Sequence, residues 1–262
     1  MQISKKATCS EACQLIALVI ARLVLEKPSA VIILATGVTM ELVYVELVRL
    51  HREWGLDFSR VVTFNLDEYL GLGPEHPKSF RFFMESRLFR HINIRPENTH
   101  VPDGLAKDPF AFCQEYEEMI EKAGGVDLVL VGIGRNGHVA FVEPDEALSS
   151  RTTLKMLSES TQEANFGTSE GVSRYALTMG IGTIMAGRQI VLLATGEKKA
   201  EAIAKAVEGP ITTEVPASLL QLHRNVTVVV DEAAGSQLSR RYPSQLPLEQ
   251  SLPDYPDGLM VI

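Results

Sequence analysis

Three observations predict an α/β fold built on one doubly wound, mostly parallel sheet. Short apolar runs recur along the chain, each is followed by a segment with helical periodicity, and polar or glycine-rich loops join the two. Continuous apolar strands are typical of a parallel sheet whose two faces are both covered. The alternation predicts crossover units, and therefore a Rossmann-like arrangement of three αβα layers.

The predicted elements follow one another in a regular order. The apolar runs that predict strands are residues 30–34, 61–65, 126–132, 189–194 and 226–230. The segments with helical periodicity include residues 11–25, 40–54, 110–123 and 198–208. In such sheets the chemistry lies at the carboxyl ends of the strands, so the loops that follow the strands are the candidate site.

One domain is predicted for residues 1–236, because no linker rich in Pro, Gly or Ser and no run of like charge divides them. The periodic pattern ends at residue 237, where a segment with several prolines begins. Residues 237–262 are therefore predicted to form an extended C-terminal tail, to which we assign no catalytic role.

The composition indicates a soluble protein that binds a small molecule. Of the 262 residues, 45% are hydrophobic, and no apolar run approaches the ~20 residues that span a bilayer. The first residues do not lead into a secretion signal, so we expect a cytoplasmic protein without membrane contacts. A formal net charge of −8 leaves no basic stripe for nucleic acid, although a few lysines and backbone amides suffice for one phosphate group.

The three cysteines are expected to be reduced and structural. Cys9 and Cys13 lie four residues apart on one predicted helix, and Cys113 stands far from both. The paired spacing of a zinc site is missing, so the cysteines predict no metal.

The loop after residues 126–132 carries the strongest chemical signal. It reads Gly132-Ile-Gly-Arg-Asn-Gly-His-Val-Ala-Phe-Val-Glu-Pro144 and places His138 five residues before Glu143. A histidine beside a carboxylate can exchange a proton near neutral pH, which predicts a catalytic loop. Glycines such as Gly137 let the backbone approach a small ligand closely. The alternative is a structural histidine that only forms hydrogen bonds within a turn.

Two adjacent carboxylates follow another predicted strand. Asp67 and Glu68 come directly after residues 61–65, in the run Phe64-Asn-Leu-Asp-Glu-Tyr69. Carboxylates at a strand end can supply a general base, but they can also cap a helix. Successive side chains of an extended segment point in opposite directions, so only one of the two is expected to face the site.

Two further loops lead from a strand into a helix and are candidate anion sites. They read Ala35-Thr-Gly-Val-Thr-Met40 and Ala194-Thr-Gly-Glu-Lys-Lys-Ala200. Backbone amides at a helix N-terminus favour phosphate, whereas Lys198 and Lys199 oppose the helix dipole unless an anion is bound. The alternatives are an ordinary turn with a threonine cap in the first loop and solvated lysines in the second.

Together these loops resemble the glucosamine-6-phosphate deaminase/isomerase family, which shares its fold with the 6-phosphogluconolactonases. The resemblance runs from about residue 8 to residue 235, and several separate motifs occur in the family's order. These are Thr63-Phe-Asn-Leu-Asp-Glu-Tyr-Leu-Gly-Leu with His76-Pro and Ser79, the ending Ala140-Phe-Val-Glu-Pro, Ser150-Arg-Thr, Tyr175-Ala-Leu-Thr-Met-Gly-Ile-Gly-Thr183, Ala206-Val-Glu-Gly209, Pro216-Ala-Ser and Leu220-Gln-Leu-His223. The ending Ala-Phe-Val-Glu-Pro is similar to the deaminase branch.

The resemblance implies that an amino-sugar 6-phosphate becomes a ketose 6-phosphate and ammonia, without a metal or organic cofactor. It assigns Asp67 to abstraction of the C2 proton, His138 to the ring-opening proton, and Glu143 to orienting and polarising that histidine. Phosphate binding is assigned to Thr36, Gly37, Thr39 and Lys199. The implied partner is a small-molecule sugar phosphate, and a homo-oligomer is compatible with the resemblance.

Among the departures from the family's pattern, three bear on catalysis, phosphate binding and regulation. Asn136 stands where an aspartate is usual two residues before the histidine; it stabilises an imidazolium less, which predicts slower ring opening. Gly167 stands where an arginine usually contacts the phosphate, and Arg174 is a candidate replacement. Thr153 replaces a basic residue of the allosteric members, so the resemblance gives no support for allosteric activation.

Three hypotheses follow. The favoured one is a deaminase/isomerase acting on glucosamine 6-phosphate or on its C4 epimer, galactosamine 6-phosphate. The second is a hydrolase of 6-phosphogluconolactone that uses His138 as its base. The third is a sugar-phosphate sensor that binds without turnover, which Asn136 and Gly167 suggest.

Overall fold

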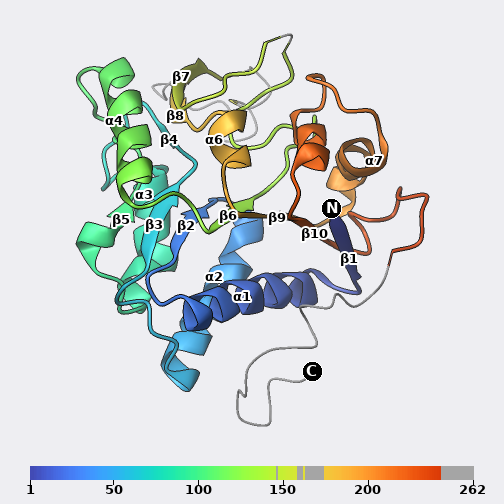
Figure 1. Ribbon diagram of the computed structural model, residues 1–262, viewed down its shortest axis with the longest axis horizontal. Coiled ribbons are helices and arrows are strands. Elements are labelled where there is room, and N and C mark those ends of the chain that lie inside the picture. The colour runs from blue at the N-terminus through green and yellow to red at the C-terminus, as the bar shows by residue number, and fades with distance from the viewer. Residues whose placement is uncertain (146, 158–161, 163–173, 243–262) are drawn as a thin grey trace.

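A seven-stranded sheet crosses the molecule, and every strand pairing within it is parallel (Figure 1). The computed structural model describes residues 1–145, 147–157, 162 and 174–242. The strands of this sheet are β1 (Gln2–Lys6), β2 (Val31–Leu34), β3 (Val62–Asn65), β5 (Thr99–His100), β6 (Leu128–Val131), β9 (Gln189–Ala194) and β10 (Val226–Asp231). The predicted fold class, a mostly parallel α/β sheet, is confirmed.

Helices cover both faces of the sheet. They are α1 (Cys9–Glu26), α2 (Val38–Trp54), α3 (Phe80–Arg87), α4 (Pro109–Lys122), α6 (Ile181–Met185) and α7 (Ala200–Glu208), with 3-10 turns η1 (Phe89–His91), η2 (Pro96–Asn98), η3 (Glu197–Lys199) and η4 (Pro216–Leu222). Figure 1 shows α1 and α2 together on one side of the central strands, and α6 and α7 on the other. The three layers expected from the sequence are therefore present.

The ends of the first two helices follow from local chemistry. Thr8 caps α1, because its hydroxyl accepts the N–H of Glu11 at 3.1 Å. Helix α2 stops at Gly55, whose left-handed φ of 71° turns the chain away from the helix. The strands between these helices are buried throughout: every residue of β2 and β6 is apolar and inaccessible. Each such side chain contributes roughly 1.5–3 kcal/mol to folding.

The order of the strands marks where a ligand is expected. Along the sheet they lie in the order β1-β10-β9-β6-β2-β3-β5. From β2 the chain winds outward to β3 and β5, returns to β6 beside β2, and then winds the other way to β9 and β10. The winding therefore reverses between β2 and β6, and open α/β sheets bind ligands at such a switch point.

A second, antiparallel sheet was not predicted from the sequence. It consists of β4 (Asp67–Tyr69), β7 (Thr153–Met156) and β8 (Tyr175–Thr178), in the order β4-β8-β7. Its own apolar cluster contains Tyr69, Leu72, Phe141, Leu157 and Ala176. Its strands have three or four residues each, too few for a clear alternating pattern.

The edge strands were also missed, for a related reason. Strand β1 is largely polar, and β5 has only two residues, so neither has the apolar signature of a buried strand. In contrast, the five predicted strands all exist, with ends that shift by up to two residues. The expectation of free thiols also holds, since Cys9, Cys13 and Cys113 form no disulfide.

The start of the predicted tail is anchored to α7. Glu208 accepts hydrogen bonds from the backbone N–H groups of Ser239 and Arg240, both at 2.9 Å, and from the hydroxyl of Tyr242. Residues 243–262 lie outside the described residues, so an extended tail, like the domain boundary, stays a prediction.

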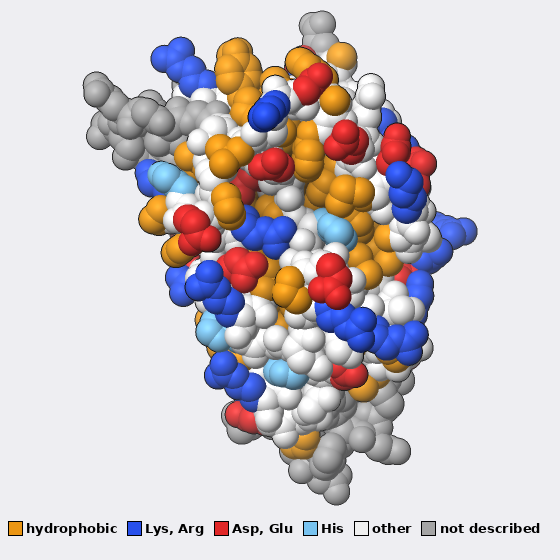
Figure 2. All heavy atoms as spheres, turned by 90° about the vertical axis from the view of Figure 1, so that its left-hand side faces the viewer, with side chains coloured by type: hydrophobic (Ala, Val, Ile, Leu, Met, Phe, Trp, Pro, Cys, Tyr) orange, Lys and Arg blue, Asp and Glu red, His pale blue; other side chains and the backbone are white. Residues whose placement is uncertain are grey.

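Two surface properties bear on partners. Figure 2 shows acidic and basic side chains interspersed on one face of the molecule, with no basic stripe there. No helix among the described residues is long and apolar enough to cross a membrane.

Candidate active site

Loops that follow four neighbouring strands meet at the carboxyl edge of the sheet. In spatial order the strands are β9, β6, β2 and β3. The loop after β9 carries Lys199, the loop after β6 carries His138 and Glu143, the turn after β2 carries Thr36 and Gly37, and the chain after β3 leads to Asp67. The residues predicted from the sequence therefore follow the strands on both sides of the switch point.

Asp67 is a buried carboxyl group without a described hydrogen-bond or ion-pair partner. It lies on β4 opposite Thr178 of β8, and only 7% of its surface is exposed. Burial raises the pKa of Asp67 to about 8, and the neighbouring charge of Glu68 adds to this increase. A carboxyl group whose pKa lies near neutrality is well suited to exchange a proton with a substrate.

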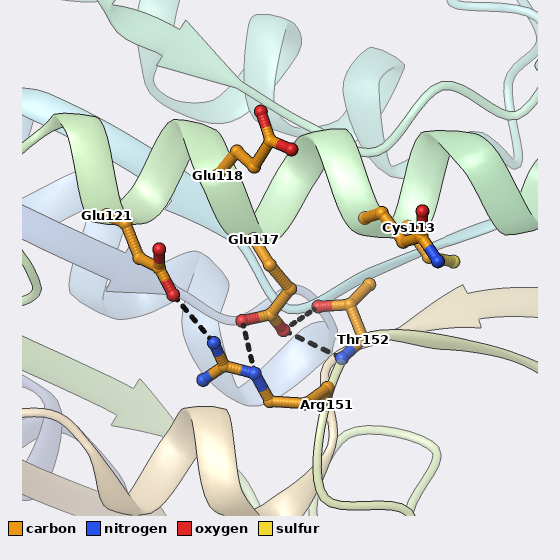
Figure 3. A pocket seen from close by; sticks show the side chains of 7 residues that line it. Cys113, Glu117, Glu118, Glu121, Arg151 and Thr152 are labelled. Atoms are coloured by element: carbon orange, nitrogen blue, oxygen red, sulfur yellow. Dashed lines mark hydrogen bonds and ion pairs between the residues drawn. The ribbon is translucent and has the colours of Figure 1, made fainter.

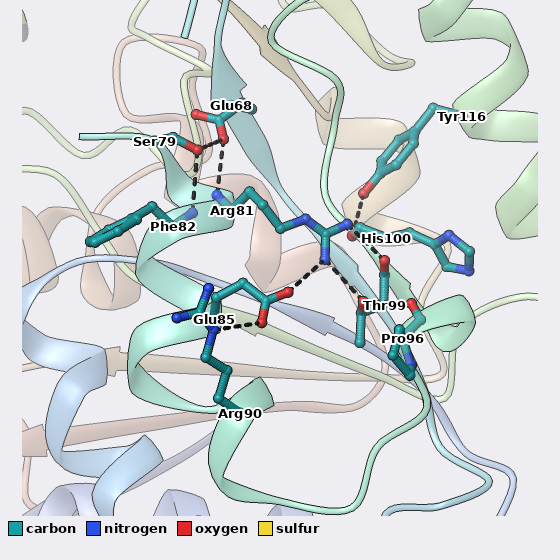
Figure 4. Close-up of polar contacts among 10 residues, drawn as sticks. All are labelled: Glu68, Ser79, Arg81, Phe82, Glu85, Arg90, Pro96, Thr99, His100 and Tyr116. Atoms are coloured by element: carbon teal, nitrogen blue, oxygen red, sulfur yellow. Dashed lines mark hydrogen bonds and ion pairs between the residues drawn. The ribbon is translucent and has the colours of Figure 1, made fainter. Parts of the chain in front are cut away.

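Glu68 has a different role, which Figure 4 shows. Its carboxylate accepts the hydroxyl of Ser79 at 2.7 Å and the backbone N–H groups of Phe80 and Arg81 at 2.9 Å. It thereby caps the N-terminus of α3, where a negative charge is favourable. Of the two adjacent carboxylates, Glu68 is the helix cap, and Asp67 remains the candidate base.

The histidine and its carboxylate are close together, as predicted. The Nδ1 atom of His138 lies 3.3 Å from Oε2 of Glu143, within ion-pair distance but without the geometry of a hydrogen bond. The side-chain N–H of Asn136 donates to the same Oε2 atom at 2.7 Å, and its Oδ1 accepts the backbone N–H of His138 at 3.3 Å. Asn136 therefore holds the carboxylate against the histidine.

The backbone of this loop places the imidazole ring. The N–H of Gly134 donates to the carbonyl of His138 at 2.8 Å, and a Cβ atom at position 134 would lie only 2.3 Å from Cε1 of the ring. Gly137, whose φ is 87°, accepts the N–H of Ala217 on its carbonyl. Only glycine at position 134 leaves room for the ring in this position.

Thr178 joins the histidine loop to the strand of the candidate base. It pairs with Asp67 across the small sheet, and its Oγ1 accepts the N–H of Phe141 at 3.1 Å. The Phe141 ring lies 5.6 Å from that of Tyr69 on the same strand as Asp67. The small sheet thus connects the strand of Asp67 to the loop of His138 through Phe141, a link that the sequence did not reveal.

The turn after β2 presents open backbone amides. Gly37 begins α2 with a φ of 110°, no side chain caps the helix, and a Cβ at this glycine would meet no atom within 4 Å. Within the described part of the chain, the N–H groups of Gly37, Val38 and Thr39 have no acceptor. The predicted alternative of a threonine cap is wrong, and the turn is available to an anion.

The same four residues occur again after β9, a signal that the sequence analysis missed. Leu-Ala-Thr-Gly forms residues 34–37 and 193–196, and the second glycine has a similar conformation, with a φ of 85°. Here, however, the N–H of Gly196 is bound by both carboxylate oxygens of Asp231 at 3.0 Å. The second turn therefore has an internal anion.

The two lysines after this second turn differ. Lys198 is exposed, whereas Lys199 is half-buried. Burial lowers the pKa of Lys199, and the positive charge of Arg135, from the histidine loop, lowers it further. No carboxylate of the described residues pairs with Lys199 or Arg135, so both cations are available to an anion.

Two predictions about phosphate contacts remain open. Gly167 lies outside the described residues. Arg174 lies just before β8, is exposed, and its carbonyl accepts the N–H of Leu157. Arg135 was not predicted as a site residue, although it lies three residues before His138 in the predicted catalytic loop.

A cavity of about 350 Å³ lies elsewhere, beside α4 (Figure 3). Its wall includes Glu117, which accepts the N–H of Thr152 at 2.7 Å and the hydroxyl of Thr183 at 2.6 Å. Arg151 lies 3.5 Å from Glu117 and donates to Glu121 at 2.7 Å. These contacts tie the chain before β7 and helix α6 to α4.

No group of three or more possible metal ligands occurs in the described ranges.

The fold and the edge loops define an α/β protein that carries a buried carboxyl group, a histidine–carboxylate pair and a turn with open backbone amides around the switch point of its sheet. The sequence profile described as glucosamine-6-phosphate isomerases/6-phosphogluconolactonase matches residues 3–229. The chain therefore belongs to this family, as the sequence motifs indicated.

Individual relatives agree with this assignment. A glucosamine-6-phosphate deaminase from Thermoanaerobacter sp. (strain X514) is 50% identical over 214 residues, which cover 80% of this chain and 85% of the relative. The solved structure of a monomeric glucosamine-6-phosphate deaminase has a TM-score of 0.87 at 43% identity and covers 90% of this chain and 100% of its own. The 6-phosphogluconolactonase from Trypanosoma cruzi shares the fold, with a TM-score of 0.74 at 19% identity and coverage of 91% and 97%.

Proposed function

We propose that this protein is an amino-sugar-6-phosphate deaminase/isomerase that converts glucosamine 6-phosphate into fructose 6-phosphate and ammonia. The observation that carries the proposal is Asp67, a buried carboxyl group with a raised pKa on β4, the strand whose Tyr69 contacts Phe141 of the histidine loop. Similarity to the relatives supports the same reaction.

Phosphate binding anchors the substrate at the turn after β2. The backbone amides around Gly37 and Thr39 and the hydroxyl of Thr36 supply hydrogen bonds, and Lys199 supplies positive charge. Gly137 allows the histidine loop to approach the sugar.

Ring opening uses the pair formed by His138 and Glu143. The imidazole moves a proton from the C1 hydroxyl group to the ring oxygen, the C1–O5 bond breaks, and an aldehyde forms at C1. Glu143, held by Asn136, stabilises the positive charge that the imidazole carries during this transfer.

Enolisation and release of ammonia use Asp67. Its carboxylate removes the C2 proton, the C1 oxygen takes a proton from the C2 ammonium group, and an enolamine forms. The same carboxyl group then returns its proton to C1. The resulting C2 iminium adds water and expels ammonia, which leaves a ketone at C2. Because Asp67 is buried without a described cation beside it, an ammonium group on C2 of the substrate favours its ionised form.

This electrostatic requirement favours an amino sugar over a lactone. Lactone hydrolysis needs a base that deprotonates the attacking water, and His138 can act as that base. No step of lactone hydrolysis then uses Asp67. We therefore place the amino-sugar reaction first, with galactosamine 6-phosphate as the epimer to compare.

The test measures ammonia release from both amino-sugar 6-phosphates. We expect turnover by the parent protein and a loss on the order of 10²–10⁴-fold in the Asp67→Asn variant. Lys198→Ala, which changes an exposed cation near the site, is the matched control and keeps parental activity. The proposal fails if neither amino-sugar 6-phosphate is turned over. Lactone hydrolysis that persists in Asp67→Asn would then favour the hydrolase. Binding of fructose 6-phosphate without reaction would favour the sensor.

A further inference from the structure

The two halves of the proposed site are joined by one buried side chain. Asn65 is the last residue of β3, lies opposite Leu34 of β2, and is fully buried. Its side-chain N–H donates to the carbonyl of Leu34 at 3.2 Å, a carbonyl that also accepts the backbone N–H of Leu66 at 3.2 Å. Leu34 begins the anion-binding turn, and Asp67 follows Asn65 by two residues. Asn65 therefore links the strand that precedes the phosphate site to the strand that precedes the base.

A tyrosine on α4 fixes the backbone of the same residue. The hydroxyl of Tyr116 accepts the N–H of Asn65 at 3.1 Å and donates to the carbonyl of Asn65 at 2.9 Å or to that of His100 at 3.0 Å. Figure 4 shows Tyr116 beside His100. Tyr116 is itself fully buried. Asn65 is thus held through its backbone and its side chain, where the chain leaves the parallel sheet for the small one.

We propose that Asn65 is a positioning residue that sets the separation between the bound phosphate and the carboxylate of Asp67. The inference rests on the proposed function, because that reaction requires the phosphate at C6 and the proton at C2 to be held at the same time. A misplacement of about 1 Å between two such anchors can cost ~100-fold in rate. Asn65 touches neither anchor; it acts through the ends of the strands that carry them.

The chain offers a matched control for this proposal. Thr63 lies two residues earlier on β3, on the same face, and is also buried. Its hydroxyl has no hydrogen-bond partner among the residues that the structure describes. Thr63→Val therefore changes a buried polar group of the same strand without breaking the link to β2.

The test variant is Asn65→Leu, which keeps the number and branching of the side-chain heavy atoms and removes the donor. The carbonyl of Leu34 keeps its bond from Leu66, so the variant is expected to fold. Four quantities are measured: kcat and KM for glucosamine 6-phosphate, exchange of the C2 hydrogen in D2O, inhibition by inorganic phosphate, and Tm. We expect kcat and C2 exchange to fall together by ~10- to 100-fold. Phosphate inhibition and Tm stay near their parental values, and Thr63→Val changes none of the four.

Two results would overturn the inference. One is parental kcat in Asn65→Leu; the other is a loss of phosphate inhibition and Tm that parallels the loss of kcat, which indicates a general defect of the fold. If Asn65→Leu does not fold, Asn65→Ser, which is smaller, is judged by the same criteria. Failure of the proposed function is separate, since it appears in the parent protein as an absence of both ammonia release and C2 exchange.

Discussion

The two Leu-Ala-Thr-Gly turns show how one local sequence serves two purposes. Both follow a strand of the parallel sheet, both precede a helical turn, and both place glycine at a positive φ, 110° at Gly37 and 85° at Gly196. The N–H of Gly196 is bound by the carboxylate of Asp231, whereas the amides at Gly37 have no acceptor within the described ranges.

The four residues specify a backbone conformation, and the surroundings of each turn decide what its amides bind. The turn at residues 193–196 has its anion built into the fold, at the end of β10. The turn at residues 34–37 offers comparable donors without a described acceptor, and under the proposed function the substrate phosphate is their anion. The turn at residues 193–196 therefore shows how a carboxylate binds this backbone conformation, and the open turn can be compared with it.

Within the comparison of the two turns, a substitution in the open turn is expected to change activity most. Gly37→Ala puts a Cβ on a backbone with a φ of 110°, which L residues rarely adopt, so the amides must move. We expect kcat/KM for glucosamine 6-phosphate to fall ~100-fold, because a set of phosphate donors contributes on the order of 2–3 kcal/mol. Gly196→Ala imposes comparable strain on the occupied turn; there we expect a lower Tm with a smaller change in kcat/KM. Equal effects of both variants on kcat/KM would contradict the division of roles.

The next effect distinguishes two adjacent lysines. Lys199 is half-buried and has no described carboxylate partner, whereas Lys198 is exposed. Lys199→Ala is expected to raise KM ~10-fold or more, since a charge-assisted hydrogen bond contributes about 1.5–3 kcal/mol. Lys198→Ala is the control. Steady-state kinetics that show equal KM values in both variants would remove Lys199 from the phosphate site.

The next prediction concerns stability and compares two carboxylates, Asp231 at the end of β10 and Asp67 at the start of β4. Asp231 receives N–H donors from Gly196 and Ala234, whereas Asp67 is buried without a described donor. Asp231→Ala is therefore expected to lower the free energy of unfolding at pH 8 by about 1–2 kcal/mol, and Asp67→Asn is expected to raise it.

The effect at Asp67 has a defined pH dependence. The folded pKa of about 8 lies above the unfolded value of roughly 3.9, so the folded state binds more protons between these limits. Stability is lost as pH rises through this window, and Asp67→Asn removes that loss. Urea unfolding of both proteins at pH 4 and pH 8 measures it: the variant should gain on the parent only at the higher pH. A constant difference between them would argue against the raised pKa.

The sequence predicted the central sheet well because its strands are continuous apolar runs buried on both faces. It singled out Asp67, His138, Glu143 and Thr36 as candidates for the same reason, because each follows such a strand. It could not assign roles within adjacent pairs, because position in the chain does not specify burial or hydrogen-bond partners. Glu68 is occupied by the N-terminus of α3, eleven or more residues away, and only the folded chain shows this.

The small sheet was missed for a tertiary reason. Strand β4 has three residues and pairs with β8, more than 100 residues later, so no local pattern marks it. Its register nevertheless places Asp67 opposite Thr178 and beside the histidine loop. The repeated Leu-Ala-Thr-Gly was visible in the sequence, but its meaning depends on Asp231, which only the structure identifies.

The smallest expected effect concerns Arg135, whose charge has two opposing consequences. It adds attraction for an anion near Lys199, and it also lowers the pKa of Lys199. Arg135→Ala removes one cation, but it also raises the pKa of Lys199, so that Lys199 keeps its proton to higher pH. We therefore expect KM to rise only ~2- to 5-fold, an effect as small as that of an exposed ion pair. The diagnostic is the pH profile of inhibition by inorganic phosphate. Its alkaline limb, where Lys199 loses its proton, should move to higher pH in Arg135→Ala and stay in place in Lys198→Ala. An alkaline limb that does not move, together with an unchanged KM, would show that Arg135 does not act on the phosphate.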